Sequence, residues 1–243
     1  MSSPPYGART ARLRVIMLDV TDSEENIGKV VDEAWAVWGR IDVLVNNAGR
    51  GSNAVLEEGG ADLMRAVFET NVFGAVKVTN TILPHCCRRK SGLIIFLGSR
   101  SSGRPIFPYI DSSYLATKAA IHAISESLAV EVAQFGIHVL LAIPGGSRTS
   151  QLNTPYTMNH HFADYDGYRE DSLREMHEHW NHAQGDPAKA MDVLVDVGMP
   201  LPSWLLLGRP TFLYAKKQSE RLLENISIWE GISRDLDFDI TVE

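Results

Sequence analysis

The stretch Gly39-Arg-Ile-Asp-Val-Leu-Val-Asn-Asn-Ala-Gly49 runs from an apolar segment directly into two asparagines and a glycine. Residues 41–45 within it are apolar apart from one aspartate, which predicts a strand covered on both faces. Polar and small residues that follow such a strand lie at its carboxyl end, where open α/β sheets bind their ligands. The stretch therefore predicts one strand of a parallel sheet that ends beside a binding site.

Further apolar runs of the same kind alternate with longer segments of helical spacing. We predict strands over residues 13–18, 93–97 and 137–143, with an edge strand over 204–208. We predict helices over residues 24–38, 61–88 (with a break near Asn71), 112–135, 187–197 and 211–229. Strands that alternate with helices predict an α/β fold with a Rossmann-like doubly wound parallel sheet.

No internal repeat or low-complexity linker divides the 243 residues, so we predict a single domain over residues 1–243. Residues 1–12 are expected to form a disordered arm. Residues 150–185 are polar, aromatic and rich in histidine, and an insertion after a strand end of an α/β protein commonly covers the ligand crevice. We therefore expect residues 150–185 to form a substrate lid.

The composition narrows the class of partner. The formal net charge is −7 with no cluster of basic residues, which disfavours nucleic acid because phosphate binding depends on many lysines and arginines. No apolar stretch approaches the ~20 residues that span a bilayer, and the N-terminal residues lack the apolar centre of a signal peptide. The only cysteines, Cys86 and Cys87, are adjacent, so we expect them to be reduced. We expect a cytoplasmic protein that binds neither membrane nor nucleic acid.

The strongest chemical pattern is Tyr114 with Lys118, at the start of the helix predicted over residues 112–135. Their spacing places phenol and ammonium on one helix face, where the cation favours the phenolate and lowers the tyrosine pKa toward neutrality. Such a tyrosine can donate a proton. Small and polar residues end three successive strands, which predicts a ligand site along one edge of the sheet. These residues are Asn46, Asn47 and Gly49, then Gly98 and Ser99, then Pro144, Gly145 and Thr149.

These residues stand in a set of motifs that together resemble the short-chain dehydrogenase/reductase family. The motifs are LDVTD (18–22), GRIDVLVNNAG (39–49), NVFG (71–74), GLIIFLGS (92–99), YLATK (114–118), GIHVLLAIPGGSRT (136–149) and GDPAKA (185–190). The resemblance covers residues 13–240 in the family's order. It implies an oxidoreductase that transfers a hydride between NAD(P) and a ketone or secondary alcohol.

The resemblance also implies roles for single residues. Tyr114 donates or accepts the substrate proton, Lys118 lowers its pKa and holds the nicotinamide ribose, and a serine polarises the carbonyl oxygen. Asn71 matches the asparagine whose helix kink holds a water that links the lysine to solvent. Counting back from Tyr114 selects Ser101 as the serine, whereas the strand motif 92–99 selects Ser99. We choose Ser99, because strand register fixes side-chain direction, and keep Ser101 as the alternative.

The expected cofactor is NADP or NAD, with NADP slightly preferred, and no metal is expected. The cofactor-binding residues that the resemblance implies are Asp19 and Val20 against adenine, Asn46, Asn47 and Gly49 beside the adenosine ribose, Thr149 on the carboxamide with Ser147 as its neighbour, and Tyr114 and Lys118. The expected partners are a carbonyl or alcohol substrate and further copies of the chain, in a homodimer or homotetramer.

In the family, the segment that matches residues 18–22 ends the third strand and follows a first strand, a glycine-rich phosphate loop, a helix and a second strand. Here the only glycine before Asp19 is Gly7. We therefore expect an N-terminally truncated sheet with exposed apolar edges and without the loop whose N–H groups cradle a pyrophosphate. The alternative function is that of a degenerate member with impaired cofactor binding, acting as a binding or structural protein or as a cofactor-independent catalyst.

Two other patterns are weaker. Residues 49–54 satisfy G-x-G-x-x-A, but a dinucleotide fingerprint needs a helix that opens directly on the glycines, and we expect the helix to begin later. His177 and His182 are spaced unlike the histidines of a helical zinc site, which lie four residues apart. A fairly large, partly apolar substrate is indicated by the lid residues Tyr156, Met158, Phe162, Tyr165, Tyr168, Met176 and Trp180.

Overall fold

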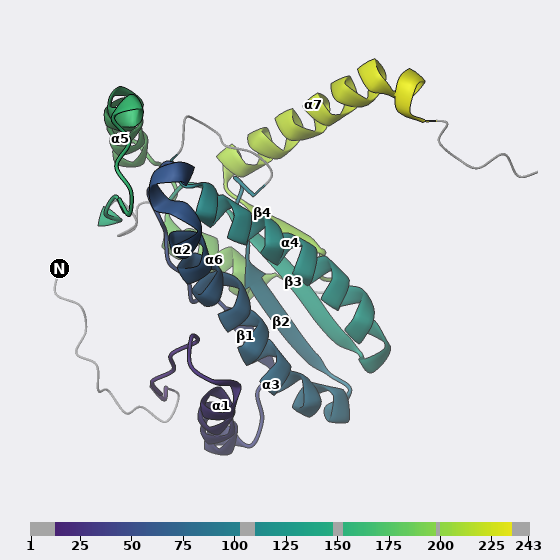
Figure 1. The fold of residues 1–243 in the computed structure, drawn as a ribbon. Helices are drawn as coiled ribbons and strands as arrows, with labels where there is room; N and C mark the ends of the chain where they lie inside the picture. The colour runs from purple at the N-terminus through teal and green to yellow at the C-terminus, as the bar shows by residue number, and fades with distance from the viewer. Residues whose placement is uncertain (1–12, 103–109, 148–152, 198–199, 235–243) are drawn as a thin grey trace, which may run out of the picture.

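The computed structural model describes residues 13–102, 110–147, 153–197 and 200–234 (Figure 1). The arm expected over residues 1–12 lies outside the described residues. The strands are β1 (Val43–Asn46), β2 (Gly92–Leu97), β3 (Ile137–Pro144) and β4 (Trp204–Leu207). The α-helices are α1 (Glu24–Trp38), α2 (Leu56–Phe68), α3 (Gly74–Arg89), α4 (Ser112–Val132), α5 (Asp166–Asn181), α6 (Pro187–Asp196) and α7 (Arg209–Ser233).

The described strands form one parallel sheet in the order β1-β2-β3-β4. Asn46 is opposite Phe96, and Leu97 is opposite Ala142, so the carboxyl ends of neighbouring strands lie at the same edge. Helices lie in every connection between successive strands, as parallel pairing requires. This arrangement confirms the predicted Rossmann-like α/β fold.

Helices cover both faces of the sheet (Figure 1). Because side chains alternate along a strand, Ile94 and Phe96 pack with α1, α3 and α4, whereas Ile95 packs with α6 on the opposite face. At the edge strand β1, Val43 and Val45 remain exposed, in agreement with the expectation of an exposed apolar edge.

Three predicted strands occur within a residue or two of their expected bounds, and the edge strand predicted over residues 204–208 is β4. The strand predicted over residues 13–18 is wrong. This segment forms no ladder with any described strand, and Met17 is 86% exposed. Apolar composition favours a strand only where a neighbouring strand supplies hydrogen bonds, and residues 13–18 have no such neighbour among the described strands.

The helices follow the predicted pattern, with a correction to the second one. It begins at Leu56 rather than at residue 61, and Gly60 interrupts it with a φ of 64°, a conformation that glycine adopts without steric cost. The predicted break near Asn71 is confirmed, because a π-helix over Glu69–Phe73 joins α2 to α3. Since α2 does not open directly on Gly49 or Gly51, residues 49–54 lack the geometry of a dinucleotide fingerprint.

Residues 153–185, called the lid from here on, contain α5 and are anchored to α2 by one carboxylate. Glu58 on α2 is 0% exposed. It accepts hydrogen bonds from the Arg169 guanidinium, with the Nε contact at 3.0 Å, and from the Tyr156 hydroxyl. The Arg169 hydrogen bonds lower the pKa of Glu58 to about 2, although burial acts in the opposite direction. The lid is therefore attached to the fold through a buried ion pair.

Replacing Glu58 with glutamine should loosen this attachment. Glu58→Gln removes the charge that the Arg169 guanidinium pairs with, so we expect the Tm to fall by about 5 °C at neutral pH. The carboxylate stabilises the fold above its unfolded-state pKa of 4.5, and this contribution is lost as the pH falls toward 2. The Tm difference between the two proteins should therefore shrink over that interval in calorimetry.

Glu25→Gln is the matched control, because Glu25 is exposed on α1 and pairs only with Lys29 among the described residues. Its effect on Tm should be within the error of measurement. Equal Tm values for Glu58→Gln and Glu25→Gln would contradict the anchoring role of Glu58.

Candidate active site

The candidate site lies at the carboxyl edge of the sheet, where the loops after three strands meet the first turns of α4. Asn47 and Gly49 follow β1, Ser99 follows β2 and Ser147 follows β3. Together with Tyr114 on α4 they line two neighbouring cavities. The structure therefore has two cavities at the strand ends, where the sequence predicts a ligand site.

The larger cavity has a volume of about 420 Å³, which is within the range of small-molecule sites, ~300–1,000 Å³. Five of the residues expected to bind the cofactor line it: Asn47, Gly49, Tyr114, Lys118 and Ser147. Gly49 has little room for a side chain, because a Cβ there would lie 3.3 Å from Asn71 Oδ1. The cavity therefore has the size of a small-molecule site and gathers these five residues on its walls.

The smaller cavity has a volume of about 90 Å³ and shares Tyr114 with the larger one. Ser99 and Ser101 line it from the loop after β2, and Met176 and Trp180 line it from the lid. The phenol of Tyr114 thus stands where the two cavities join. A group in the smaller cavity and a group in the larger one can both approach this side chain.

Tyr114 and Ser99 line the same smaller cavity. Burial raises the pKa of Tyr114 to about 12, the nearby Asp111 carboxyl adds to the rise, and the Ser99 hydroxyl opposes it. The expectation that Lys118 lowers this pKa toward neutrality is wrong for this structure. Burial is the largest cause of the shift, because the buried phenolate loses its water.

Lys118 lies beside Tyr114, with Nζ 5.6 Å from the centroid of the phenol ring. Its Nζ donates a hydrogen bond to the carbonyl oxygen of Leu97 at 2.7 Å. Burial lowers the pKa of Lys118 to about 8. The Lys118 ammonium, at the wall of the larger cavity, therefore loses its proton closer to neutral pH than an exposed lysine does.

Ser99 and Ser101 are close to each other, with 3.3 Å between their hydroxyl oxygens. The N–H of Ser101 donates to Ser99 Oγ at 3.2 Å, and this hydrogen bond restrains the Ser99 side chain. Both serines line the smaller cavity with Tyr114, and of the two Ser99 is the one that lowers the Tyr114 pKa.

Asn71 is buried in the π-helix and its amide joins three segments of the chain. Its Oδ1 accepts from the Arg50 N–H at 2.8 Å, and its Nδ2 donates to the Arg50 carbonyl at 3.0 Å. Nδ2 also donates to Thr117 Oγ1 at 3.1 Å. Asn71 therefore fixes the loop after β1 against the helix that carries Tyr114.

Three residues expected to bind the cofactor do not line either cavity. Asp19 makes a turn, with its Oδ1 accepting from the Thr21 N–H at 2.9 Å, and this hydrogen bond lowers the pKa of Asp19. Val20 packs against Gly74, where a Cβ would come within 2.7 Å of it. Asn46 donates to Thr79 on α3 at 2.9 Å. Thr149 lies outside the described residues.

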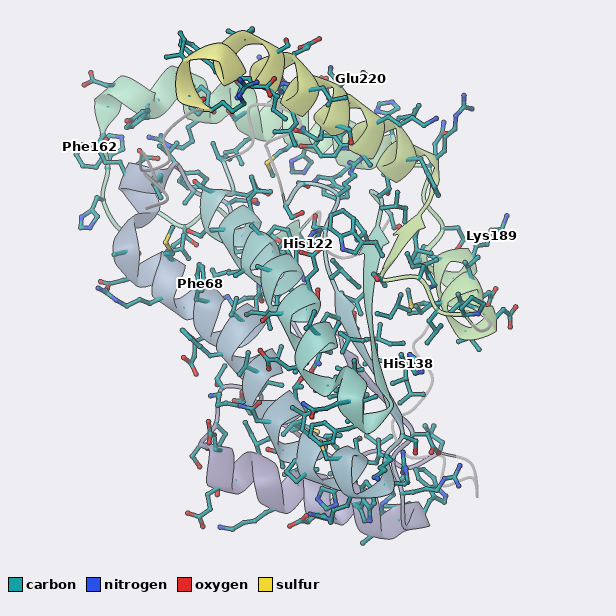
Figure 2. The ribbon with its side chains drawn as sticks, turned by 90° about the vertical axis from the view of Figure 1, so that its right-hand side faces the viewer. Phe68, His122, His138, Phe162, Lys189 and Glu220 are labelled. Carbon is teal, nitrogen blue, oxygen red and sulfur yellow. The ribbon has the colours of Figure 1, made fainter. Side chains whose placement is uncertain are left out.

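The sequence reading missed His122, which stands one helical turn beyond Lys118 on α4. Its Nε2 accepts the Ser99 N–H at 3.3 Å, and its Nδ1 lies 3.1 Å from Ser102 Oγ. Burial lowers the pKa of His122 to about 4, so the ring is neutral and can accept this N–H. Figure 2 shows His122 near the carboxyl end of the strands and His138 toward their other end. The four-residue spacing from Lys118 was the signal that could have identified it.

The histidines of the lid do not assemble a metal site. His179 Nε2 lies 3.0 Å from an Arg100 guanidinium nitrogen, and His182 Nδ1 lies 2.7 Å from the Glu178 carbonyl oxygen. Over the described ranges, no three His, Cys, Asp or Glu side chains gather as metal ligands would. Among the described helices, none has the length and apolar character needed to cross a bilayer.

Fold and site together define a Rossmann-like α/β protein with a ligand site at the carboxyl edge of its sheet. A family model described as short chain dehydrogenase matches residues 6–159. The oxidoreductase BOA17 of Botryotinia fuckeliana is 33% identical over 228 residues, which are 91% of this chain and 81% of that protein. The chain belongs to the short-chain dehydrogenase family.

Solved structures show the same likeness. A short-chain dehydrogenase from Streptomyces avermitilis aligns with a TM-score of 0.76 and 34% identity over 92% of this chain and 80% of its own. A gluconate 5-dehydrogenase from Burkholderia cenocepacia, solved in complex with NADP and tartrate, aligns with a TM-score of 0.52 and 29% identity over 55% and 51%. The uncharacterized oxidoreductase YusZ of Bacillus subtilis is 39% identical over 144 residues, which are 58% of this chain and 49% of YusZ. The chain thus spans about half the length of YusZ.

The burial of Lys118 predicts an unusual titration. An NMR titration of isotopically labelled lysine side chains should show one ammonium that loses its proton near pH 8. Because burial lowers the pKa from 10.5, the unfolded chain binds this proton more tightly, and the contribution of Lys118 to stability rises with pH between about 8 and 10.5. Lys118→Arg should remove that resonance, and Lys217→Arg, on an exposed position of α7, should leave it. Titration of every lysine near 10.5 would contradict the burial.

Proposed function

We propose that the protein is an oxidoreductase that transfers a hydride between NADP or NAD and a ketone or secondary alcohol, with Tyr114 as the proton donor or acceptor. The observation that carries this proposal is the position of the Tyr114 phenol. Tyr114 lines both cavities, with Ser99 in the smaller cavity and Lys118 beside its ring. Membership of the short-chain dehydrogenase family supports the same activity.

In the direction of carbonyl reduction, Tyr114 gives its phenolic proton to the substrate oxygen. A pKa of about 12 keeps this proton on Tyr114 at neutral pH, which suits a proton donor. The Ser99 hydroxyl donates a second hydrogen bond to the same oxygen and stabilises the negative charge that develops there. In the reverse direction the phenolate accepts the proton of the alcohol, and Lys118 lowers the cost of that phenolate by its charge.

The larger cavity holds the cofactor in this proposal. Lys118 binds the ribose hydroxyls beside the nicotinamide, and Asn47, Gly49 and Ser147 enclose the same half of the molecule. When bound, the nicotinamide would carry the hydride. The related gluconate 5-dehydrogenase was solved with NADP, which supports NADP as the first nucleotide to test.

The smaller cavity holds the part of the substrate next to the reacting carbon. Of the lid residues that the sequence singles out, Met176 and Trp180 line it, whereas Tyr156 is engaged with Glu58 and Tyr165 with Glu57. Its volume of about 90 Å³ suits a short, partly apolar group near the phenol. We also propose that copies of the chain pair through the helices that carry Asn71 and Tyr114, in a homodimer or homotetramer.

Removing the phenolic hydroxyl tests the proposal. Tyr114→Phe should lower kcat for NADPH-dependent ketone reduction by about a thousandfold, because the variant keeps the ring but loses the acid. Isothermal titration should show that the variant still binds NADPH. The matched control is Tyr168→Phe, which changes an exposed tyrosine of α5 and should leave kcat unchanged.

Two results would contradict the proposal. Full activity of Tyr114→Phe would remove Tyr114 from the mechanism. A folded wild-type protein that binds neither NADPH nor NADH would favour the alternative, a family member that acts as a binding protein or without a cofactor.

His122 should act on the reaction through Ser99. His122→Leu deprives the Ser99 N–H of its acceptor, so we expect kcat to fall about tenfold with KM nearly unchanged, because Ser99 loses its orientation. His122→Gln can accept the same N–H through its amide oxygen and should restore most of kcat. His138→Leu, at an exposed position of β3, is the control. Equal kcat for His122→Leu and wild type would show that Ser99 does not depend on His122.

A further inference from the structure

Two buried oxygens that line the smaller cavity have no hydrogen-bond partner within the described part of the chain. They are Ser52 Oγ and Asp111 Oδ1. Ser52 is 4% exposed, so bulk solvent does not reach its hydroxyl. A buried polar atom without a partner costs free energy, and in native proteins such atoms are few. Two of them around one small cavity call for a ligand that completes them.

Backbone contacts join the two segments that carry these residues. The Ala54 N–H donates to the Ile110 carbonyl at 2.5 Å, and Ala54 and Asp111 form an isolated parallel bridge. The loop that carries Ser52 is thereby fastened to the first residue before α4. Asp111 then lies within one helical turn of Tyr114, and its charge contributes to the raised pKa of the phenol.

The other polar groups around the cavity already have partners. Asn53, next to Ser52, donates to the Thr154 carbonyl at 2.7 Å. Ser99 is engaged with Ser101 and His122. Arg100 lies 3.0 Å from His179 Nε2. The two unpaired oxygens therefore stand apart from the groups to which the reaction assigns a role.

The charges around the cavity select the chemistry of the missing group. Arg100 lines the cavity and repels a cationic group, whereas Asp111 repels a carboxylate or phosphate. A neutral hydroxyl is compatible with both, because it can donate to a carboxylate oxygen and accept from a serine hydroxyl. It is also small enough for a cavity of about 90 Å³ that must admit the reacting carbonyl as well.

We infer that Ser52 and Asp111 form a subsite for a hydroxyl group carried by the substrate next to its reacting carbonyl, so that the substrate class is hydroxyketones and the corresponding diols. This inference rests on the proposed function. The substrate hydroxyl donates to Asp111 and accepts from Ser52. Burial raises the pKa of the Asp111 carboxyl to about 7, and a hydrogen bond donated to it by a substrate hydroxyl would favour its charged form.

A matched pair of small ketones tests the subsite. Hydroxyacetone and 2-butanone have the same number of heavy atoms and differ by a hydroxyl in place of a methyl group. With NADPH, the wild-type protein should show a kcat/KM for hydroxyacetone that is at least about tenfold higher than for 2-butanone. Asp111→Asn and Ser52→Ala should each reduce this ratio about fivefold or more, because each removes one partner of the hydroxyl.

Asp62→Asn is the matched control, since Asp62 is exposed on α2 with a side chain that is 88% accessible. Its ratio should equal that of the wild type. The fold of Asp111→Asn should survive, because the Asp111 side chain makes no capping hydrogen bond to α4. Ser52→Ala provides a second, independent variant.

A binding measurement separates the two levels of the proposal. Ligand-observed NMR should show that propane-1,2-diol binds the wild-type protein more tightly than butan-2-ol, and that both variants lose this preference. Turnover of both ketones with equal ratios in wild type and variants would overturn the subsite and leave the proposed function intact. Absence of turnover with a retained preference for the diol would overturn the proposed function alone. Equal binding of the two alcohols without turnover would overturn both.

Discussion

The arrangement of the site depends on one buried amide. Asn71 lies in the π-helical turn between α2 and α3. Its side chain hydrogen-bonds the backbone N–H and carbonyl of Arg50 and donates to the hydroxyl of Thr117. A buried amide is stable only when its donors and acceptors are paired, so these bonds allow little movement. The spacing between the loop after β1 and the face of α4 that carries Tyr114 and Lys118 follows from it. Thr117 transmits the constraint, because its hydroxyl also donates to the Tyr114 carbonyl at 2.7 Å.

The spacing of apolar residues predicted the helices, which are stabilised within one segment, and the strands that pair with other apolar strands. The helix over Glu24–Trp38 was predicted to the residue, and in the structure Ser23 caps its N-terminus and Gly39 ends it. The strands after it were predicted because continuous apolar runs suit a sheet with two covered faces. Residues 13–18 have the same composition and no strand beside them among those described, so composition alone misled. Pairing is a property of two segments, and a single run cannot show it.

The same distinction separates the site residues that the sequence predicted from those that it did not. Tyr114, Lys118, Ser99 and Asn71 could be predicted because the family motif keeps them at fixed places in the chain. His122, Asp111, Ser52 and Glu58 were not predicted. The sequence offered a signal only for His122, in its four-residue spacing from Lys118, because the surroundings of all four residues depend on other elements of the fold. The sequence also missed the direction of the Tyr114 pKa. Proximity of phenol and ammonium follows from helical spacing, whereas burial of both depends on the loops and on the lid that cover them.

In the proposed reaction, burial of both Tyr114 and Lys118 decides which protonation states of the pair are stable. Desolvation raises the phenol pKa and lowers the ammonium pKa, so the charged form of each is disfavoured when it stands alone. Attraction between phenolate and ammonium is strongest in the same low-dielectric surroundings, but it acts only when both are ionised. The pair therefore favours two states, neutral tyrosine with its proton available for donation and phenolate stabilised by a protonated lysine. Residues 153–185, attached to α2 by the Glu58 ion pair, place Trp180 on the walls of both cavities, and any water that this cover excludes strengthens the attraction between the two charges.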